Sequence, residues 1–302
     1  MNGILILDKP AGFTSFDGVA VLRGLTRERK IGHTGTLDPM ATGVLPILLG
    51  RAAKALNFLP DTDKEYVASF RLGERRDTGD VTGAVVETSP APVSQEALEK
   101  VLPAFRGEIL QVPPMYSAVS VGGKRLYELA RKGVEVERQA RPVTVSALEL
   151  LSYDPQSREG TLRVACSKGT YIRVLLEDIA RAAGSCGAMT ALRRTRACGF
   201  GEEDARSLEE LKALAGEGRL TQVLRPVESL FGEYPLVRVS PAQAQRFQNG
   251  GSLDLERLRK APEEGLCRVK SPEGQFLGLG RVDRQKGQLV FAKSFFERED
   301  GT

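Results

Sequence analysis

The 302-residue sequence contains no tryptophan, one histidine and four cysteines, and these shortages exclude several kinds of site. The cysteines are Cys166, Cys186, Cys198 and Cys267. They lie far apart, with no CxxC pair and no nearby histidine, so we expect no metal site. We interpret them as unpaired thiols of a reducing compartment. A Ser-His-Asp or Cys-His catalytic site would have to use His33, and no GxSxG motif is present to hold a nucleophilic serine.

Long hydrophobic runs and complete nucleotide-binding motifs are also missing. No apolar run approaches the roughly 18 to 20 residues that span a bilayer, and the N-terminus lacks the basic start of a secretory signal. Residues 119–125 lack the first glycine and the final Ser/Thr of a P-loop, and residues 277–283 lack the third glycine of a dinucleotide-binding loop. We therefore expect a soluble cytoplasmic protein with no membrane partner and no cofactor. Any chemistry must come from carboxylates, tyrosines, arginines or lysines.

Positive and negative charges nearly balance over the whole chain, but they are unevenly distributed between its segments. The net charge is +4, whereas residues 120–200 hold 14 basic and 8 acidic residues, and residues 201–232 hold 4 basic and 7 acidic ones. A basic surface of this kind suits a polyanion, although a solvated charged face would give the same count. Charge alone leaves both interpretations open.

The length predicts about two domains at roughly 150 residues each. Strands are expected at 4–7, 44–49, 66–72, 81–88, 143–153 and 161–167, and they alternate irregularly with helices, which favours a mixed α+β fold. Proline and glycine interrupt the chain at 224–235, and three further strands follow. We place a larger domain at 1–228 and a small β-rich domain at 229–302.

Helix boundaries are predicted from capping residues. Ser15 is expected to cap a helix that ends near Gly24, and Ser94, Ser207 and Ser240 are expected to cap three others. The clearest helix opens at Thr170, where apolar residues recur at helical spacing and a glycine follows: Ile172, Leu175, Leu176, Ile179, Ala182, Ala183 and Gly184.

One loop, residues 32–45, concentrates residue types that suit a binding site. It holds three glycines, three threonines, the only histidine and Asp38 immediately before a buried strand. Glycine allows a ligand to approach the backbone closely, and Pro39 restricts the chain just after Asp38. Asp38 is therefore either a catalytic carboxylate on a rigid turn or the cap of a helical turn that begins at Pro39.

Four segments in order resemble motifs of the TruB family, the tRNA pseudouridine-55 synthases. They are this loop, the N-terminal segment 7–15 (LDKPAGFTS), Lys64-Glu65-Tyr66, and the segment 167–173 (SKGTYIR). The resemblance runs over residues 1–230. It implies a pseudouridine-synthase catalytic domain with a central mixed or antiparallel sheet, and more weakly a PUA-like C-terminal domain that binds RNA.

The resemblance also implies the chemistry. The enzyme would isomerise a uridine of the tRNA T-loop to pseudouridine without a cofactor or metal, with Asp38 as the nucleophile. Arg173 would pair with Asp38 and hold it ionised, whereas helical spacing alone allows a surface pair with Glu177. The aspartate could attack C1′ of the ribose, attack C6 of the base, or promote glycal formation.

Further site residues follow from the same resemblance. Tyr66 would stack on the flipped base, Tyr171 would contact it, Leu192 would line the uracil pocket, and His33 would meet the RNA beside it. Without the resemblance, a structural role is favoured for Tyr66, Leu192 and His33, and Tyr171 could equally be a tyrosine that covers the core. Arg193, Arg194 and Arg196 are candidates for phosphate contacts.

The expected partner is the T-arm stem-loop of tRNA, with no obligate protein partner and a monomeric chain. Three alternatives stay open: a synthase of the same fold acting on another RNA, a non-catalytic RNA-binding or RNA-folding protein, and a glycoside hydrolase. The last would require two carboxylates that flank the bond.

Overall fold

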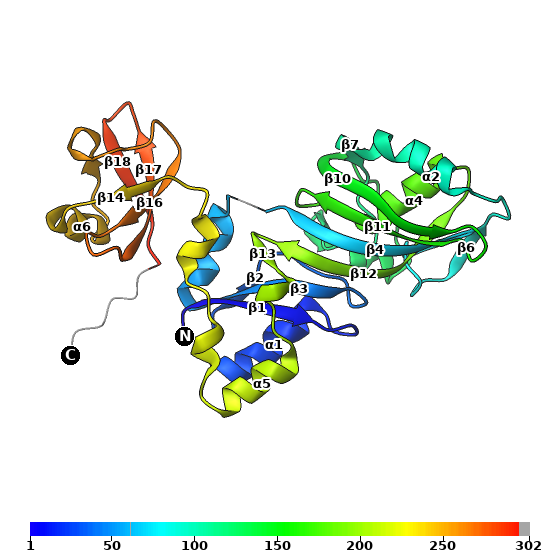
Figure 1. Cartoon of the computed structure of the whole chain (residues 1–302), viewed down its shortest axis with the longest axis horizontal. Coiled ribbons are helices and arrows are strands. Elements are labelled where there is room, and N and C mark those ends of the chain that lie inside the picture. Colours follow the sequence, from blue (N-terminus) through cyan, green and yellow to red (C-terminus); the bar gives the residue numbers. More distant parts are fainter. Residues whose placement is uncertain (61, 296–302) are drawn as a thin grey trace.

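The computed structural model describes residues 1–60 and 62–295 (Figure 1). The larger part of the chain contains strands β1 (Gly3–Lys9), β2 (Ile31–His33), β3 (Thr42–Leu49), β4 (Lys64–Leu72), β5 (Glu74–Arg76), β6 (Val85–Thr88), β7 (Gly107–Gln111), β8 (Ser120–Val121), β9 (Lys124–Arg125), β10 (Arg141–Asp154), β11 (Glu159–Cys166), β12 (Gly187–Ala197) and β13 (Phe200–Gly201). Its α-helices are α1 (Ser15–Thr26), α2 (Gln95–Val101), α3 (Leu126–Ala130), α4 (Ile172–Ala182) and α5 (Leu208–Gly216). Its 3-10 helices are η1 (Gly50–Phe58), η2 (Leu102–Phe105), η3 (Glu202–Asp204), η4 (Leu220–Val223) and η5 (Val227–Phe231). No helix in the described ranges has the length and apolar character needed to cross a membrane.

Nine strands form one large sheet in the order β1-β3-β12-β4-β11-β10-β7, with β2 paired to β3 and β13 to β12. The β3–β12 pair is parallel, and the other pairs of this sheet are antiparallel. The prediction of a mixed sheet in an α+β fold is therefore confirmed.

The apolar sequences of β1 and β3 are explained by burial on both faces of the sheet. Side chains alternate along a strand, so Leu45 and Ile47 enter the main core, while Val44 and Leu48 enter a second core on the opposite face. A strand buried on both faces has an unbroken apolar sequence. The strand predicted at 44–49 is thus confirmed and sits next to the glycine-rich loop.

The helix predicted to begin at Ser15 is capped by Thr14 instead. The Thr14 hydroxyl accepts from the amide of Asp17, and the Asp17 carboxylate accepts from the amide of Thr14, which completes a capping box. Ser15 is buried and accepts a hydrogen bond from the Leu37 amide (2.8 Å). The prediction was wrong by one residue because Ser15 bonds to the loop that carries Asp38.

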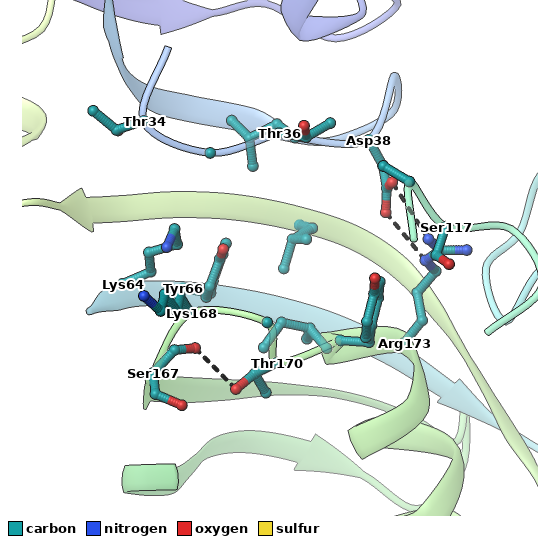
Figure 2. Close-up of a pocket in the computed structure, with 17 residues that line it drawn as sticks. Thr34, Thr36, Asp38, Lys64, Tyr66, Ser117, Ser167, Lys168, Thr170 and Arg173 are labelled. Atoms are coloured by element: carbon teal, nitrogen blue, oxygen red, sulfur yellow. Dashed lines mark hydrogen bonds and ion pairs between the residues drawn. The ribbon is translucent and has the colours of Figure 1, made fainter. Parts of the chain in front are cut away.

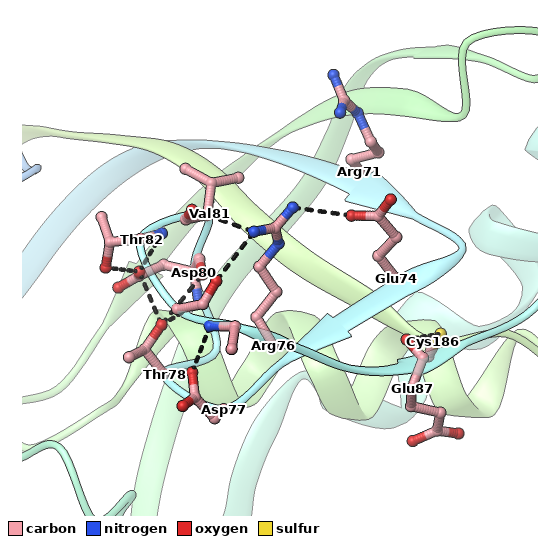
Figure 3. Close-up of polar contacts among 12 residues, drawn as sticks. Arg71, Glu74, Arg76, Asp77, Thr78, Asp80, Val81, Thr82, Glu87 and Cys186 are labelled. Carbon is pink, nitrogen blue, oxygen red and sulfur yellow. Dashed lines mark hydrogen bonds and ion pairs between the residues drawn. The ribbon is translucent and has the colours of Figure 1, made fainter.

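Two other element boundaries also differ from prediction. The strand expected at 81–88 exists only at β6, because Asp80 accepts hydrogen bonds from Thr78 and Thr82 and holds a turn there (Figure 3). Helix α4 begins at Ile172 rather than Thr170, and the predicted apolar stripe is buried except at its C-terminal end, where Ala182 is exposed. The caps at Ser94, Ser207 and Ser240 are confirmed.

The C-terminal part forms its own sheet, which is the orange and red end of Figure 1. Its strands are β14 (Leu236–Arg238), β15 (Leu253–Asp254), β16 (Leu266–Lys270), β17 (Phe276–Asp283) and β18 (Gln288–Lys293), in the order β14-β16-β17-β18-β15. Helix α6 (Pro241–Gln248) and η6 (Leu255–Arg257) complete it. The prediction of a small β-rich C-terminal unit is confirmed, and the exact boundary at 228/229 stays a prediction.

The two units share an apolar cluster at their junction. Phe231 of η5 is fully buried, and its ring lies 5.4 Å from that of Phe295 and 6.1 Å from that of Phe276. The same cluster includes Ile4 and Ile6 of β1. Beside it, Glu228 forms ion pairs with Arg268 (3.2 Å) and Lys270 (2.9 Å). The C-terminal unit is therefore packed against the large sheet.

We expect Phe231→Ala to lower the free energy of unfolding by about 3–5 kcal/mol, because it leaves a cavity between the two units. Urea denaturation measures this change. Phe16→Ala is the matched control, since the Phe16 side chain is 65% exposed and its loss should have little effect on stability. An equal change in both variants would contradict a packed junction.

Candidate active site

A pocket of about 300 Å³ lies between the glycine-rich loop and the start of α4 (Figure 2). We call it the Asp38 pocket. Its lining comes from five parts of the chain: residues 34–38, Lys64 and Tyr66 of β4, Ser117 and Ala118, residues 167–173, and Leu192 of β12. Five of the six predicted site residues line this pocket: Asp38, Tyr66, Tyr171, Arg173 and Leu192.

Asp38 is held at the tip of a turn by bonds to its neighbours. The Ser15 hydroxyl accepts from the Leu37 amide, the Ala41 amide donates to the Asp38 carbonyl (3.0 Å), and the Gly12 amide donates to the Pro39 carbonyl (2.8 Å). These bonds hold the backbone of the turn in place, and Asp38 lines the pocket. The side chain is 35% exposed.

Arg173 binds the Asp38 carboxylate through two nitrogens. Its Nε lies 3.1 Å from Oδ2, and its Nη2 donates to Oδ1 at 3.3 Å. The guanidinium also donates to the carbonyls of Thr78 (2.7 Å) and Tyr116 (2.9 Å), and only 6% of the side chain is exposed. The predicted Asp38–Arg173 pair is confirmed, and this buried geometry leaves Arg173 unavailable for a surface pair with Glu177.

A second carboxylate, Asp80, lies on the turn between β5 and β6. Its Oδ2 is 4.0 Å from Nε of Arg173, and its side chain is 7% exposed. Arg76 fixes the same turn by donating to the carbonyl of Gly83 (2.9 Å) (Figure 3). Sequence reasoning interpreted residues 77–80 only as a turn and missed this carboxylate. One guanidinium therefore faces two acids, and of these Asp38 lines the Asp38 pocket.

The pKa of Asp38 is raised above its ordinary value. The main cause is burial, which disfavours the carboxylate, and the negative charge of Asp80 adds to it. The charges of Arg173 and Lys9 act in the opposite direction. Arg173 thus counteracts a burial that would otherwise favour the protonated acid.

Lys9 joins two loops beneath Asp38. It is fully buried, and its Nζ donates to the carbonyls of Pro10 (2.9 Å), Phe13 (2.6 Å) and Pro39 (3.4 Å). Burial lowers the pKa of Lys9 to about 8, although the charge of Asp38 opposes this shift. The sequence showed Lys9 only as part of a motif, and its role as a buried donor was missed.

We expect Lys9→Met to lower the free energy of unfolding by about 1–3 kcal/mol, because buried carbonyls lose their donor. Urea unfolding provides the measurement. Lys212→Met, at an exposed position of α5, is the control. If both variants unfold alike, Lys9 does not hold the loops together.

Tyr66 and Leu192 lie on one face of paired strands. Tyr66 pairs with Arg194 across the β4–β12 ladder, and Leu192 lies two residues before Arg194 on the same strand. Side chains at such positions share a face of the sheet. Burial raises the pKa of Tyr66, so its ring is a neutral phenol at neutral pH.

Arg194 is buried, which contradicts its proposed contact with phosphate. Its guanidinium donates to the carbonyls of Val44 (2.6 Å) and Gly35 (3.2 Å). The neighbouring Arg193 points to the other face and pairs with Asp8 at 3.1 Å. Of the three arginines, Arg196 is exposed. Alternation along β12 separates Arg193 from Arg194, and the ladder with β4 has a register shift between Arg194 and Arg196.

Tyr171 is held by its backbone at the start of α4. The buried Gln111 accepts from the Tyr171 amide (3.0 Å) and donates to its carbonyl (3.3 Å). This side-chain pairing places the tyrosine at the pocket wall. Gln111 ends β7 and carries no sequence pattern that would have predicted this role.

His33 lies beside the Asp38 pocket and is not among its lining residues in the described part of the chain. It ends β2, opposite Ile47 of β3. Burial lowers the pKa of His33, and the positive charge of Arg194 adds to this effect. The imidazole is therefore neutral at neutral pH. Its predicted contact with RNA stays a prediction.

Comparison with known proteins connects this geometry to a family. The model described as "TruB family pseudouridylate synthase (N terminal domain)" matches residues 23–172, and "tRNA pseudouridylate synthase B C-terminal domain" matches residues 173–232. A third model, "Pseudouridine synthase II TruB, C-terminal", matches residues 235–290.

Individual relatives agree with the family models. A tRNA pseudouridine synthase B of Aromatoleum aromaticum is 47% identical over 94% of this chain and 89% of its own length. Another from Stutzerimonas stutzeri is 46% identical over 93% of this chain and 92% of its own.

Solved structures share the fold. A Cbf5-Nop10-Gar1 complex contains a chain with 26% identity and a TM-score of 0.75, covering 98% of this chain and 86% of that one. An H/ACA RNP bound to a substrate RNA containing 2′-deoxyuridine has a chain with 24% identity and a TM-score of 0.75, covering 99% of this chain and 86% of that one, which shows the fold alone. The family models and the relatives, which span most of the sequence, show that the chain belongs to the TruB family of pseudouridine synthases.

Proposed function

We propose that the protein isomerises a T-loop uridine of tRNA, position 55, to pseudouridine, with Asp38 as the nucleophile. The observation that carries this proposal is the ion pair between the buried Arg173 and the partly exposed Asp38 at the wall of an open pocket. Its relatives are named tRNA pseudouridine synthase B, which supports tRNA as the substrate. The enzyme is an isomerase, as pseudouridine synthases are.

The reaction changes bonds without changing composition. The N1–C1′ bond of the uridine breaks, the base turns while bound, and a C5–C1′ bond forms. The proton on C5 leaves and N1 takes up a proton. Asp38 must be ionised to act as a nucleophile, and Arg173 stabilises that form. Attack at C1′, attack at C6 and assistance to glycal formation all require the same ionised carboxylate in the same place.

The pocket walls suit an extruded base. Extruding a base from the RNA costs roughly a few kcal/mol, and stacking of that base on an aromatic ring offsets about 1–3 kcal/mol. In our proposal Tyr66 supplies that ring and Leu192 covers the base with an apolar side chain. Tyr171 contacts the base from the start of α4, and His33 meets the RNA beside it.

Room for the RNA is available on the other side of Asp38. A second hollow of about 490 Å³ shares Asp38, Ser117 and Arg173 with the Asp38 pocket, and its walls include Tyr127 and Arg131. Asp38 is therefore accessible from two sides, which suits a nucleotide that remains part of a strand. We further propose that the T-arm is the recognised element and that the chain acts as a cytoplasmic monomer, without an obligate protein partner.

Tritium release tests the proposal. An unmodified tRNA transcript labelled at uracil C5 is incubated with the wild-type protein, and the label must leave when pseudouridine forms. We expect stoichiometric release from one T-loop uridine. Tight tRNA binding without release would favour a non-catalytic RNA-binding protein, and release only from another RNA would correct the substrate.

A further inference from the structure

The end of the Asp38 pocket farthest from the Asp38–Arg173 pair is basic. Figure 2 shows Lys64, Lys168 and Ser167 grouped on one side of the pocket, with Asp38, Ser117 and Arg173 on the other. Lys64 begins β4 and Lys168 lies in the turn before α4. Residues from two separate parts of the sequence thus bring two ammonium groups to one end of the pocket.

Among the described residues, the ion pairs include neither Lys64 nor Lys168, whereas Arg173 pairs with Asp38 and Arg163 pairs with Glu65. Lys64 Nζ donates to the carbonyl of Thr62 (2.8 Å). An ammonium group carries three donors, so this bond leaves donor capacity that can face the pocket.

The position of Lys64 makes its unpaired charge costly. Its stem passes so close to the loop that a Cβ added at Gly35 would lie 2.9 Å from Lys64 Cε. Burial is the main cause that lowers the pKa of Lys64, and the charge of the buried Arg194 adds to it, whereas the charge of Asp63 acts in the opposite direction. Desolvated charges in proteins normally have a counter-charge. Neither Lys64 nor Lys168 has such a partner among the ion pairs of the described residues, so this end of the pocket favours an anion.

The pocket lining as a whole has an excess of positive charge. Lys64, Lys168 and Arg173 are basic, and Asp38 is the one acid among the described lining residues. Uracil and ribose are both neutral, so neither requires this excess. The anionic parts of an RNA strand are its phosphates, and lysine binds phosphate as a point charge.

We propose that Lys64 and Lys168 form a phosphate subsite that binds a phosphodiester flanking the uridine held at Asp38. This inference rests on the proposed function. The half-buried Lys64 contacts the phosphate from inside the pocket, and the exposed Lys168 contacts it from the rim. Binding of this phosphate fixes the position of the nucleotide along the pocket, and Asp38 acts at the other end.

The first test measures binding without turnover. In an Asp38→Asn background, the Kd of an unmodified T-arm stem-loop is measured from low to moderate salt for Lys64→Met and Lys168→Met. Each lost phosphate contact should reduce the slope of log K against log salt by about 0.7–0.9 and weaken binding at low salt. Lys212→Met, on the exposed face of α5, should leave both unchanged. Thermal melting verifies that each variant is folded.

The second test identifies the phosphate. Stem-loops carrying a single neutral methylphosphonate on either side of the target uridine are compared in the same assay. One of the two replacements should weaken binding to the Asp38→Asn protein, and it should weaken binding to the Asp38→Asn protein with Lys64→Met little further. Equal losses in both proteins at each position would overturn the subsite, and so would unchanged salt slopes in both lysine variants. Failure of wild-type protein to release tritium would instead count against the proposed function, which this test does not require.

Discussion

Pseudouridine formation by Asp38→Asn is expected to fall by about 10⁴-fold or more, because loss of a nucleophile removes the step that starts the reaction. Asparagine has the same shape and can still accept a hydrogen bond from Arg173, so tRNA binding should persist. Single-turnover tritium release measures the rate, and filter binding measures the Kd.

The control for this variant is Asp178→Asn. Asp178 lies on α4, like Arg173, but pairs at the surface with Arg181 (3.5 Å), so its loss should leave the rate unchanged. If Asp38→Asn released tritium at the wild-type rate, another group would have to be the nucleophile. If it failed to bind tRNA, the carboxylate would serve binding rather than chemistry.

Arg173→Met is expected to lower the rate at neutral pH by about 10²–10³-fold, since it removes the charge that favours the Asp38 carboxylate and the two donors that position it. It should also change the pH profile. Burial already raises the pKa of Asp38, and loss of the Arg173 charge raises it further. The reactive form is the carboxylate, so activity falls as pH drops through that pKa. The acid limb of kcat/KM should therefore lie at higher pH in the variant than in wild type.

Arg173→Lys distinguishes charge from geometry. It keeps a positive charge near Asp38 and should place the acid limb near that of wild type, while the rate stays reduced because lysine cannot reproduce the donation to Thr78 and Tyr116. Melting temperatures control for loss of these backbone contacts. An acid limb that did not move in Arg173→Met would show that Arg173 does not keep Asp38 ionised.

Sequence motifs predicted those site residues that can be recognised from residue type and from the order of the motifs along the chain. Asp38 and Arg173 lie 135 positions apart, and their pairing followed from family resemblance and not from spacing. The double-sided burial of β3 followed from its unbroken apolar run. The mixed sheet was predicted from the irregular alternation of strands and helices, and the small β-rich C-terminal unit from the strands that follow the proline and glycine residues at 224–235.

The roles of other residues at the site could not be predicted, because they depend on which face of a strand or turn the side chain occupies. Arg194 belongs to a run of arginines that suggested a surface, yet alternation along β12 directs it inward. Asp80 was hidden in a turn sequence because its role depends on the distance between that turn and α4. Lys9 and Gln111 satisfy backbone groups of distant loops, and a single sequence does not indicate which loops meet.

The shared core at Phe231 has a consequence for how RNA can be selected. An RNA-binding module on a flexible tether accepts many spacings between two contact points and adds affinity through its effective concentration. Here the C-terminal unit is packed on the large sheet through apolar rings and the ion pairs of Glu228. Any RNA that touches both the C-terminal sheet and the Asp38 pocket must present those two points at one distance and one orientation. The rigid junction therefore selects folded RNAs in which the two contact points have that fixed separation and orientation.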